Sequence, residues 1–205
     1  FNYVEAALNY QKNIGKNELS GTLIYLASHF QTANAGSLQL SLPKRNQGVS
    51  GRFTYGFDNR YLAEFNFGYN GSERFWDDNK YGFFPSVGLA YNVHNEQFFA
   101  PLADVVNKFK IRGTYGLVGN DQIGNEYDRF FFLSNVNLNY PSGGYTFGYN
   151  YDYYRPGVHV SRYENKGISW EKSFKSNIGF EVGIMNSLNV EFDFYQEMRT
   201  NILMN

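Results

Sequence analysis

The sequence is most regular over Ser173-Phe174-Lys175-Ser176-Asn177-Ile178-Gly179-Phe180-Glu181-Val182-Gly183-Ile184. From Phe174 onward every second residue is apolar, except Ser176, and the residues between them are polar or glycine. Successive side chains of a β-strand point to opposite faces, so this stretch predicts a strand with one apolar and one polar face. The wall of a membrane β-barrel has this pattern, because its outer face meets lipid and its inner face meets water.

The same alternation recurs along the chain. Residues 188–195 repeat it, and the link Met185-Asn186-Ser187 is short enough to join the two strands as a tight hairpin. Further strands are expected at about residues 3–12, 18–29, 49–57, 63–69, 83–91 and 109–117, which gives about eight in total. The orientation of 18–29 is ambiguous, because either of its faces could be the apolar one.

The expected connections are short at one end of the strands and long at the other. The short links are 13–17, 58–60 and 185–187, and the long ones are 31–46, 71–80 and 119–172. Outer-membrane barrels combine short periplasmic turns with long external loops, so this asymmetry orients the wall.

One link on the short side, residues 93–107, is longer than the others. It contains Phe98, Phe99, Leu102, Val105 and Val106 around Pro101. This spacing suits one or two turns of amphipathic helix, with proline near the start, where its missing N–H is tolerated. We therefore expect one short periplasmic helix here.

The composition favours strands and excludes several classes of protein. Aromatic residues make up 20% of the 205 residues, a bias typical of strands. Lys and Arg number 18 against 19 Asp and Glu, so the chain has no basic face for nucleic acid. The absence of cysteine excludes disulfides and thiolate metal sites. No apolar run approaches the roughly 18 residues of a membrane-spanning helix.

Two other architectures share the alternation. A soluble β-sandwich has it too, but would bury one face in a dry core, and the polar faces here carry Arg, Lys, Glu and Asp. About eight strands could also close alone into a small barrel. Against that closure, Ile202-Leu203-Met204-Asn205 reads as the rim of a strand, without a terminal aromatic signature. We expect an all-β fold, the wall of an antiparallel transmembrane β-barrel.

Three residue strings resemble the SusC/RagA family of TonB-dependent outer-membrane transporters of Bacteroidetes. The strings are 80–91 with Phe84-Pro85-Ser86, followed by 96–99; 109–120, ending in Gly119-Asn120; and 168–172 with Trp170-Glu171-Lys172, continuing through 177–179 to 194–203. The family's barrel has about 22 strands and is plugged from within by an N-terminal domain. The resemblance therefore implies that residues 1–205 are a partial transmembrane barrel domain from mid-barrel, without the plug and the TonB-binding segment.

The resemblance also implies a function. It is TonB-dependent active import of a bulky nutrient, an oligosaccharide or a peptide, across the outer membrane, with this barrel in a SusCD-like complex. The implied partners are a SusD-like surface lipoprotein, TonB, outer-membrane lipid and lipopolysaccharide, and the ligand, and the implied location is the cell outer membrane. The alternative is a non-transporting structural or secretion-associated outer-membrane barrel that docks partners through its loops. A soluble carbohydrate-binding β-domain is a third possibility.

No motif predicts catalysis. His29, His94 and His159 lie far apart, and none has a second ligand at metal-binding spacing. The run from Asp77 to Gly82 resembles the start of a calcium loop, but its twelfth position is Gly88, which supplies no carboxylate. An exposed acidic loop is the better interpretation. We expect no enzyme activity, no metal and no cofactor.

The best candidates for ligand binding are aromatic residues of the long external loops, with the neighbouring acidic residue Asp77. They are Phe75, Trp76 and Asp77 in the loop 71–80, and Tyr145, Tyr149, Tyr151 and Tyr153 in the loop 119–172. Pro141-Ser142-Gly143-Gly144 is expected to turn the chain between two arms of a β-hairpin above the membrane. Tyrosine rings offer flat apolar platforms with a hydroxyl, against which sugars or peptides could lie. Alternatively, these aromatics only pack the loop against its neighbours or the lipoprotein cap.

Overall fold

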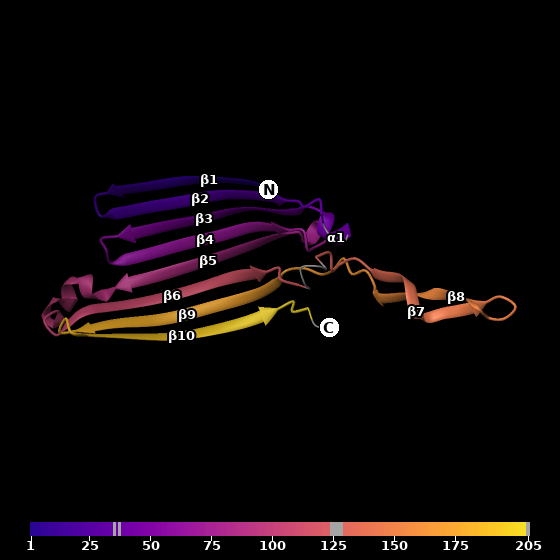
Figure 1. The fold of residues 1–205 in the computed structure, drawn as a ribbon. Helices are drawn as coiled ribbons and strands as arrows, with labels where there is room; N and C mark the ends of the chain where they lie inside the picture. Colours follow the sequence, from indigo (N-terminus) through magenta and orange to yellow (C-terminus); the bar gives the residue numbers. More distant parts are fainter. Residues whose placement is uncertain (35, 37, 124–128, 204–205) are drawn as a thin grey trace.

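The computed structural model describes residues 1–34, 36, 38–123 and 129–203. Over these residues eight long strands form one antiparallel sheet, as predicted (Figure 1). In sheet order they are β1 (Asn2–Ile14), β2 (Asn17–Phe30), β3 (Lys44–Phe57), β4 (Tyr61–Ser72), β5 (Tyr81–Asn92), β6 (Val106–Asn120), β9 (Glu171–Ile184) and β10 (Leu188–Thr200). Two further strands, β7 (Asn135–Phe147) and β8 (Tyr153–Arg162), pair with each other.

Tight turns join the strands at one end of the sheet, which we call the inner end. Asp58 and Asn59 both take positive φ, 52° and 51°, and Met185 and Asn186 take 50° and 53°. Two successive residues with positive φ are the signature of the type I′ hairpin turn, whose twist matches that of the flanking strands. The predicted hairpins at these two positions are confirmed.

The predicted short helix between β5 and β6 also lies at the inner end. It consists of two 3₁₀ segments, η2 (Val93–Asn95) and η3 (Gln97–Leu102). Pro101 lies inside η3 rather than near the start of the helix. Short connectors of this kind commonly take 3₁₀ form, because a few residues leave no room for regular α-helical turns.

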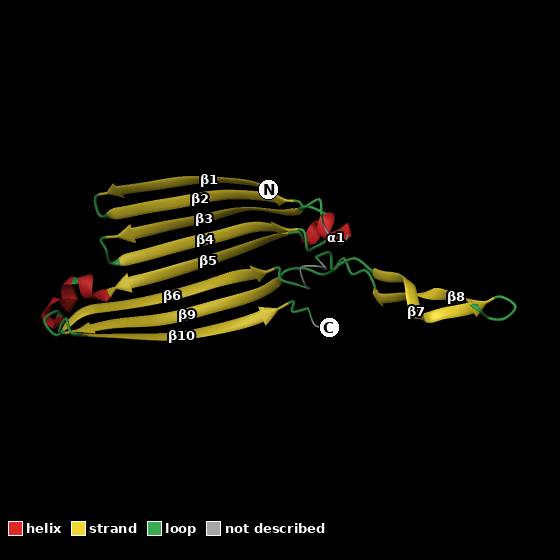
Figure 2. Ribbon diagram, in the orientation of Figure 1, coloured by secondary structure: helices red, strands yellow, loops and turns green. Residues whose placement is uncertain are grey.

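The opposite, outer end carries the long connections. They contain α1 (Leu38–Ser41), η1 (Asp77–Asn79) and the hairpin of β7 and β8. The hairpin extends away from the outer end of the sheet, and the helices between β5 and β6 lie at the far end (Figure 2).

The turn of this hairpin is not where the sequence placed it. Pro141-Ser142-Gly143-Gly144 lies within β7, and the prediction of a turn there is wrong. The chain turns at 148–152 instead, where Gly148 and Tyr151 take φ of 96° and 55°. The register of the β7–β8 pair shifts between Tyr140 and Tyr145, so the four residues are absorbed as a bulge.

The strand register gives the sheet one apolar and one polar face. Phe65 lies opposite Val87 on the apolar face, and Asn66 lies opposite Ser86 on the polar face. The register also settles the orientation of β2. Leu19 pairs with Tyr55, which is a residue of the apolar face, so Leu19, Leu23 and Tyr25 belong to that face.

The eight-stranded sheet has no dry core of its own. The buried hydrophobic side chains of the described residues are Phe75, Val93, Phe99, Ile123, Phe132, Ile168 and Trp170, and each lies in a connection between strands. A sandwich would instead bury one face of its strands. No helix among the described residues is long and apolar enough to cross a membrane.

Candidate functional site

Two pairs of stacked tyrosines mark the limits of the apolar face. Tyr61 stacks on Tyr91 at the inner end, with 5.0 Å between ring centroids, and Tyr69 stacks on Tyr81 at the outer end, at 5.3 Å. Between them this face of β4 and β5 carries Ala63, Phe65, Phe67, Phe83, Pro85, Val87 and Leu89. The strand from Tyr81 to Tyr91 is about 34 Å long and spans about 24–28 Å of height at a tilt of 35–45°. These dimensions match an apolar barrel band between aromatic girdles.

The polar face carries a cluster of charges around Glu181. The carboxylate lies 2.7 Å from Lys108 Nζ, 3.7 Å from Lys110 Nζ and 3.2 Å from Arg112 Nε, and Arg112 Nη2 lies 2.7 Å from Asp193. Paired charges of this density suit a water-filled lumen and not a lipid-facing surface. In the described part of the chain, no three His, Asp or Glu side chains are placed to hold a metal ion.

The outer loops have a small core of their own. Phe75 is fully buried, with its ring 5.3 Å from that of Trp170, and Ile123 and Ile168 complete the cluster. Trp170 Nε1 donates to the carbonyl of Lys80 at 3.3 Å. Phe84, from the polar face of β5, meets Trp170 at 5.0 Å. The loops therefore lean over the outer end of the polar face.

Three of the predicted ligand-binding residues lie in or next to this core. Phe75 is fully buried, which leaves no part of its ring open to a ligand. Trp76 keeps 40% of its surface exposed, meets Phe132 edge-on at 5.4 Å, and has Lys166 Nζ 4.8 Å above its ring. The side chain of Asp77 is exposed.

The other four predicted residues lie on the β7–β8 hairpin. They are Tyr145, Tyr149, Tyr151 and Tyr153, and all of them are exposed, Tyr149 completely. The guanidinium of Arg155 lies 4.5 Å from the centroid of the Tyr153 ring. Because the hairpin extends away from the sheet, the structure gives two separate groups of candidates, one at Trp76 and one on the hairpin (Figure 1). Phe131 and Phe132, from the start of the same loop, instead pack at the outer core.

A polar cavity at the outer end was not anticipated from the sequence. It measures about 650 Å³ and is lined by residues that include Ser28, Lys44, Arg45, Ser72, Glu73, Arg74, Asp121 and Arg129. Arg74 Nη1 donates to the carbonyl of Ile123 at 2.6 Å, and Ser72 Oγ donates to Asp121 at 2.7 Å. The sequence signal for this cavity was a pair of charged residues at the outer end of two strands. These pairs are Lys44-Arg45 at the start of β3 and Glu73-Arg74 after the end of β4.

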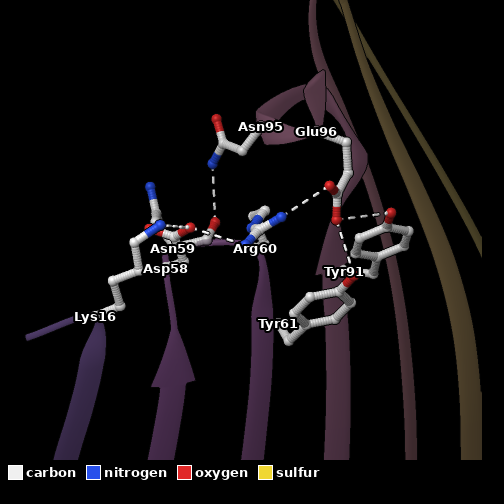
Figure 3. A network of polar contacts seen from close by, with 8 residues as sticks. All are labelled: Lys16, Asp58, Asn59, Arg60, Tyr61, Tyr91, Asn95 and Glu96. Atoms are coloured by element: carbon white, nitrogen blue, oxygen red, sulfur yellow. Dashed lines mark hydrogen bonds and ion pairs between the residues drawn. The ribbon is translucent and has the colours of Figure 1, made fainter. Parts of the chain in front are cut away.

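A polar network ties the turns of the inner end together (Figure 3). The Asp58 carboxylate forms ion pairs with Lys16 Nζ and Arg60 Nη2, each at 2.8 Å. Because Lys16 lies in the β1–β2 turn, Asp58 joins that turn to the β3–β4 turn. Arg60 Nη1 reaches Glu96 at 2.9 Å, and Asn95 donates to the carbonyl of Asn59 at 2.8 Å. The connection between β5 and β6 is thereby fastened to the β3–β4 turn.

Glu96 is the centre of this network. Its Oε1 accepts hydrogen bonds from the hydroxyls of Tyr61 at 2.8 Å and Tyr91 at 3.1 Å, the two stacked rings of the inner girdle. The Tyr61 hydroxyl and the Arg60 guanidinium hold the pKa of Glu96 below its ordinary value. The hydrogen bond from the Lys16 ammonium is the main cause that lowers the pKa of Asp58, and Arg60 lowers it further.

The network should release when its carboxylates are protonated. A carboxyl group whose pKa is lowered in the folded protein contributes stability at pH values above its ordinary pKa, which is 4.5 for Glu96. This contribution is lost as the pH falls through the folded-state pKa. We expect hydrogen-exchange protection factors of the amides at 93–97 to fall as the pH is lowered below about 4.5. Glu96→Gln should lower protection at neutral pH and flatten this pH dependence. Equal pH dependence in both proteins would contradict the role given to Glu96.

Comparisons with known proteins agree with the geometry. No protein-family profile matches the chain. The TonB-dependent receptor SusC of Bacteroides thetaiotaomicron is 34% identical over 151 residues, and the TonB-dependent receptor P3 of Formosa agariphila is 31% identical over 148. Each alignment covers 72% of this chain. Among solved structures, the RagAB peptide transporter matches 98% of the chain with a TM-score of 0.72 at 22% identity.

The similarity concerns only part of each relative. The aligned segment is 14% of the length of either receptor and 24% of the RagAB chain. The chain thus corresponds to one section of a much longer polypeptide in its relatives.

Proposed function

Because this chain belongs to the SusC/RagA family of TonB-dependent receptors, we propose that it forms part of the wall of an outer-membrane barrel that imports a bulky nutrient. The observation that carries the proposal is the two-faced sheet. Its apolar face is bounded by tyrosine girdles, and its polar face carries paired charges such as those around Glu181. This division supports a barrel with a hydrated interior. The named relatives are receptors and transporters, which supports a role without catalysis.

Import would use the two ends of the wall differently. The outer loops and a SusD-like lipoprotein would capture the ligand, and the polar face would line its path through the barrel. Energy would come from TonB, acting on parts of the receptor outside these residues. The RagAB structure, whose name describes a peptide transporter, supports a role in import by its likeness in fold.

The exposed aromatic residues of the outer end, together with Asp77, would contact the ligand, an oligosaccharide or a peptide. We assign this contact to Trp76 and Asp77 beside the outer core, and to Tyr145, Tyr149, Tyr151 and Tyr153 on the hairpin. Their exposure supports the assignment, because rings held open to solvent can stack against a sugar or a peptide bond. Phe75 is fully buried against Trp170 and would not touch the ligand.

Uptake by the full-length receptor tests the proposal. In a strain lacking the receptor gene, we expect loss of growth on one oligosaccharide or peptide source, restored by the intact gene. Dissipation of the proton gradient should stop the restored uptake. Mass spectrometry of ligands that co-purify with the intact complex would identify the compound. Unchanged uptake of every oligosaccharide and peptide tested in the deletion strain would exclude import as the function.

Single substitutions in the same receptor test the ligand contacts. Trp76→Ala and Tyr153→Ala should each weaken binding of the identified ligand by at least about fivefold, the effect of removing one well-placed aromatic contact. Tyr163→Ala is the matched control, because Tyr163 is also an exposed tyrosine of this loop but lies beyond β8. If Tyr153→Ala left the ligand affinity unchanged but released the lipoprotein, the hairpin would be a docking arm instead.

A further inference from the structure

The connection between β5 and β6 packs against the apolar face of the wall. We call residues 93–105 the inner collar. Phe99 is 6% exposed, and its ring stacks 6.1 Å from that of Phe109, which pairs with Val182 on the apolar face. Glu96 reaches the hydroxyls of Tyr61 and Tyr91 on the same face. The inner collar therefore covers the side of the wall that faces lipid.

Two polar side chains of the inner collar, His94 and Glu96, point back to the barrel, whereas Gln97 and Asp104 are exposed. His94 Nδ1 lies 3.0 Å from the carbonyl oxygen and 3.3 Å from the amide nitrogen of Phe109. The Glu96 side chain is only 11% exposed and is paired with Arg60. The collar thus satisfies internally the polar groups that face the wall, and Gln97 and Asp104 remain open to water.

Three apolar residues of the inner collar point outward instead, unlike the buried Phe99. Phe98 is 68% exposed, Leu102 54% and Val105 48%. Val105 is joined to the β9–β10 turn, because its carbonyl accepts a hydrogen bond from the amide of Met185 at 2.9 Å. Met185 is itself 64% exposed. The result is an exposed apolar strip that continues the apolar face beyond the inner tyrosine girdle.

A lipid surface is the occupant that this geometry fits. The strip adjoins the apolar face, whose exposed side chains face acyl chains in a barrel wall. It begins at the tyrosine pair, the depth at which aromatic residues lie at the membrane–water interface. Amphipathic segments bind in this interfacial layer, with their apolar side chains at the boundary of the acyl chains and their polar side chains in water.

We propose that the inner collar is a membrane-interface anchor. Phe98, Leu102 and Val105 insert at the boundary between headgroups and acyl chains of the periplasmic leaflet, while Phe99 and Glu96 hold the collar on the wall. The anchor fixes the depth of this part of the barrel in the bilayer. This role goes beyond import and does not depend on the ligand.

Site-directed spin labelling of the full-length receptor in phospholipid bilayers tests the anchor. Phe98→Cys and Leu102→Cys, introduced into a cysteine-free background, carry a nitroxide label. We expect collisions with oxygen, which concentrates in lipid, to exceed collisions with a water-soluble nickel chelate by several-fold. Leu89→Cys, on the apolar face at 66% exposure, is the lipid-facing control. Gln97 is the exposed polar neighbour of Phe98, and a label at Gln97→Cys should collide more often with the nickel chelate than with oxygen.

Two results would overturn the proposal. Labels at 98 and 102 that collide mainly with the nickel chelate would place the strip in water. Labels shielded from both reagents would show that a protein surface covers it. Because these outcomes are read from accessibility, they are independent of whether the receptor imports its ligand.

Discussion

Val87→Arg is expected to destabilise the folded full-length receptor by about 2–4 kcal/mol in a bilayer, the usual effect of a cation at the midplane of a barrel's lipid face. Val87 lies on the apolar face opposite Phe65, between the two tyrosine girdles, and is 47% exposed. Its side chain therefore meets acyl chains, and a guanidinium there loses its hydration. The measurement is the denaturant dependence of unfolding in lipid vesicles.

Thr114→Arg is the matched control for this substitution. Thr114 pairs with Gly88, the residue that follows Val87, so it lies at the same depth on the polar face. The new cation would remain hydrated there, and we expect a change within about 1 kcal/mol, as for most exposed substitutions. Equal destabilisation by both variants would show that the two faces of the wall are not distinguished as described.

Phe75→Ala is expected to destabilise the outer core by about 3–5 kcal/mol, the usual effect of emptying a buried phenylalanine site. Phe75 is the largest fully buried side chain in the described residues and packs on Trp170. Its loss would loosen the loop at 73–80 and the segment at 166–170, which meet there. Native-state hydrogen exchange should report this as lower protection in these two segments, with the strands little affected.

Trp76→Ala is the neighbouring control for the stability of the outer core. Trp76 is 40% exposed and its ring meets Phe132 and Lys166, so its removal should reduce protection less than that of the fully buried Phe75. If the two variants lowered protection equally, the outer core would not centre on Phe75. The pair also separates the stability of the loops from any loss of ligand binding in Trp76→Ala.

The sequence alone predicted the wall because alternation is a local property. Strand faces follow from period two, and the hairpins at Asp58-Asn59 and Met185-Asn186 follow from links that only a tight turn can make. The end of the sheet that carries the long loops also follows from link lengths. The residue strings that resemble the SusC/RagA family agree with the relatives found by comparison.

Local patterns did not predict features that depend on contacts between distant segments. Phe75 and Trp76 have similar chemistry in sequence, but the packing of Trp170 decides that one is buried and the other exposed. Pro141-Ser142-Gly143-Gly144 has the composition of a turn, yet its register with β8 makes it a bulge.

The sequence by itself determined a two-faced antiparallel wall with tight turns at one end and long loops at the other, because side-chain period and link length are written in neighbouring residues. Only the tertiary structure decided which face β2 presents, where the outer loops bury their aromatics, and that the inner collar packs on the apolar face. Each of these is set by pairing and packing between residues far apart in the chain, as when Glu96 reaches Arg60 and Tyr61.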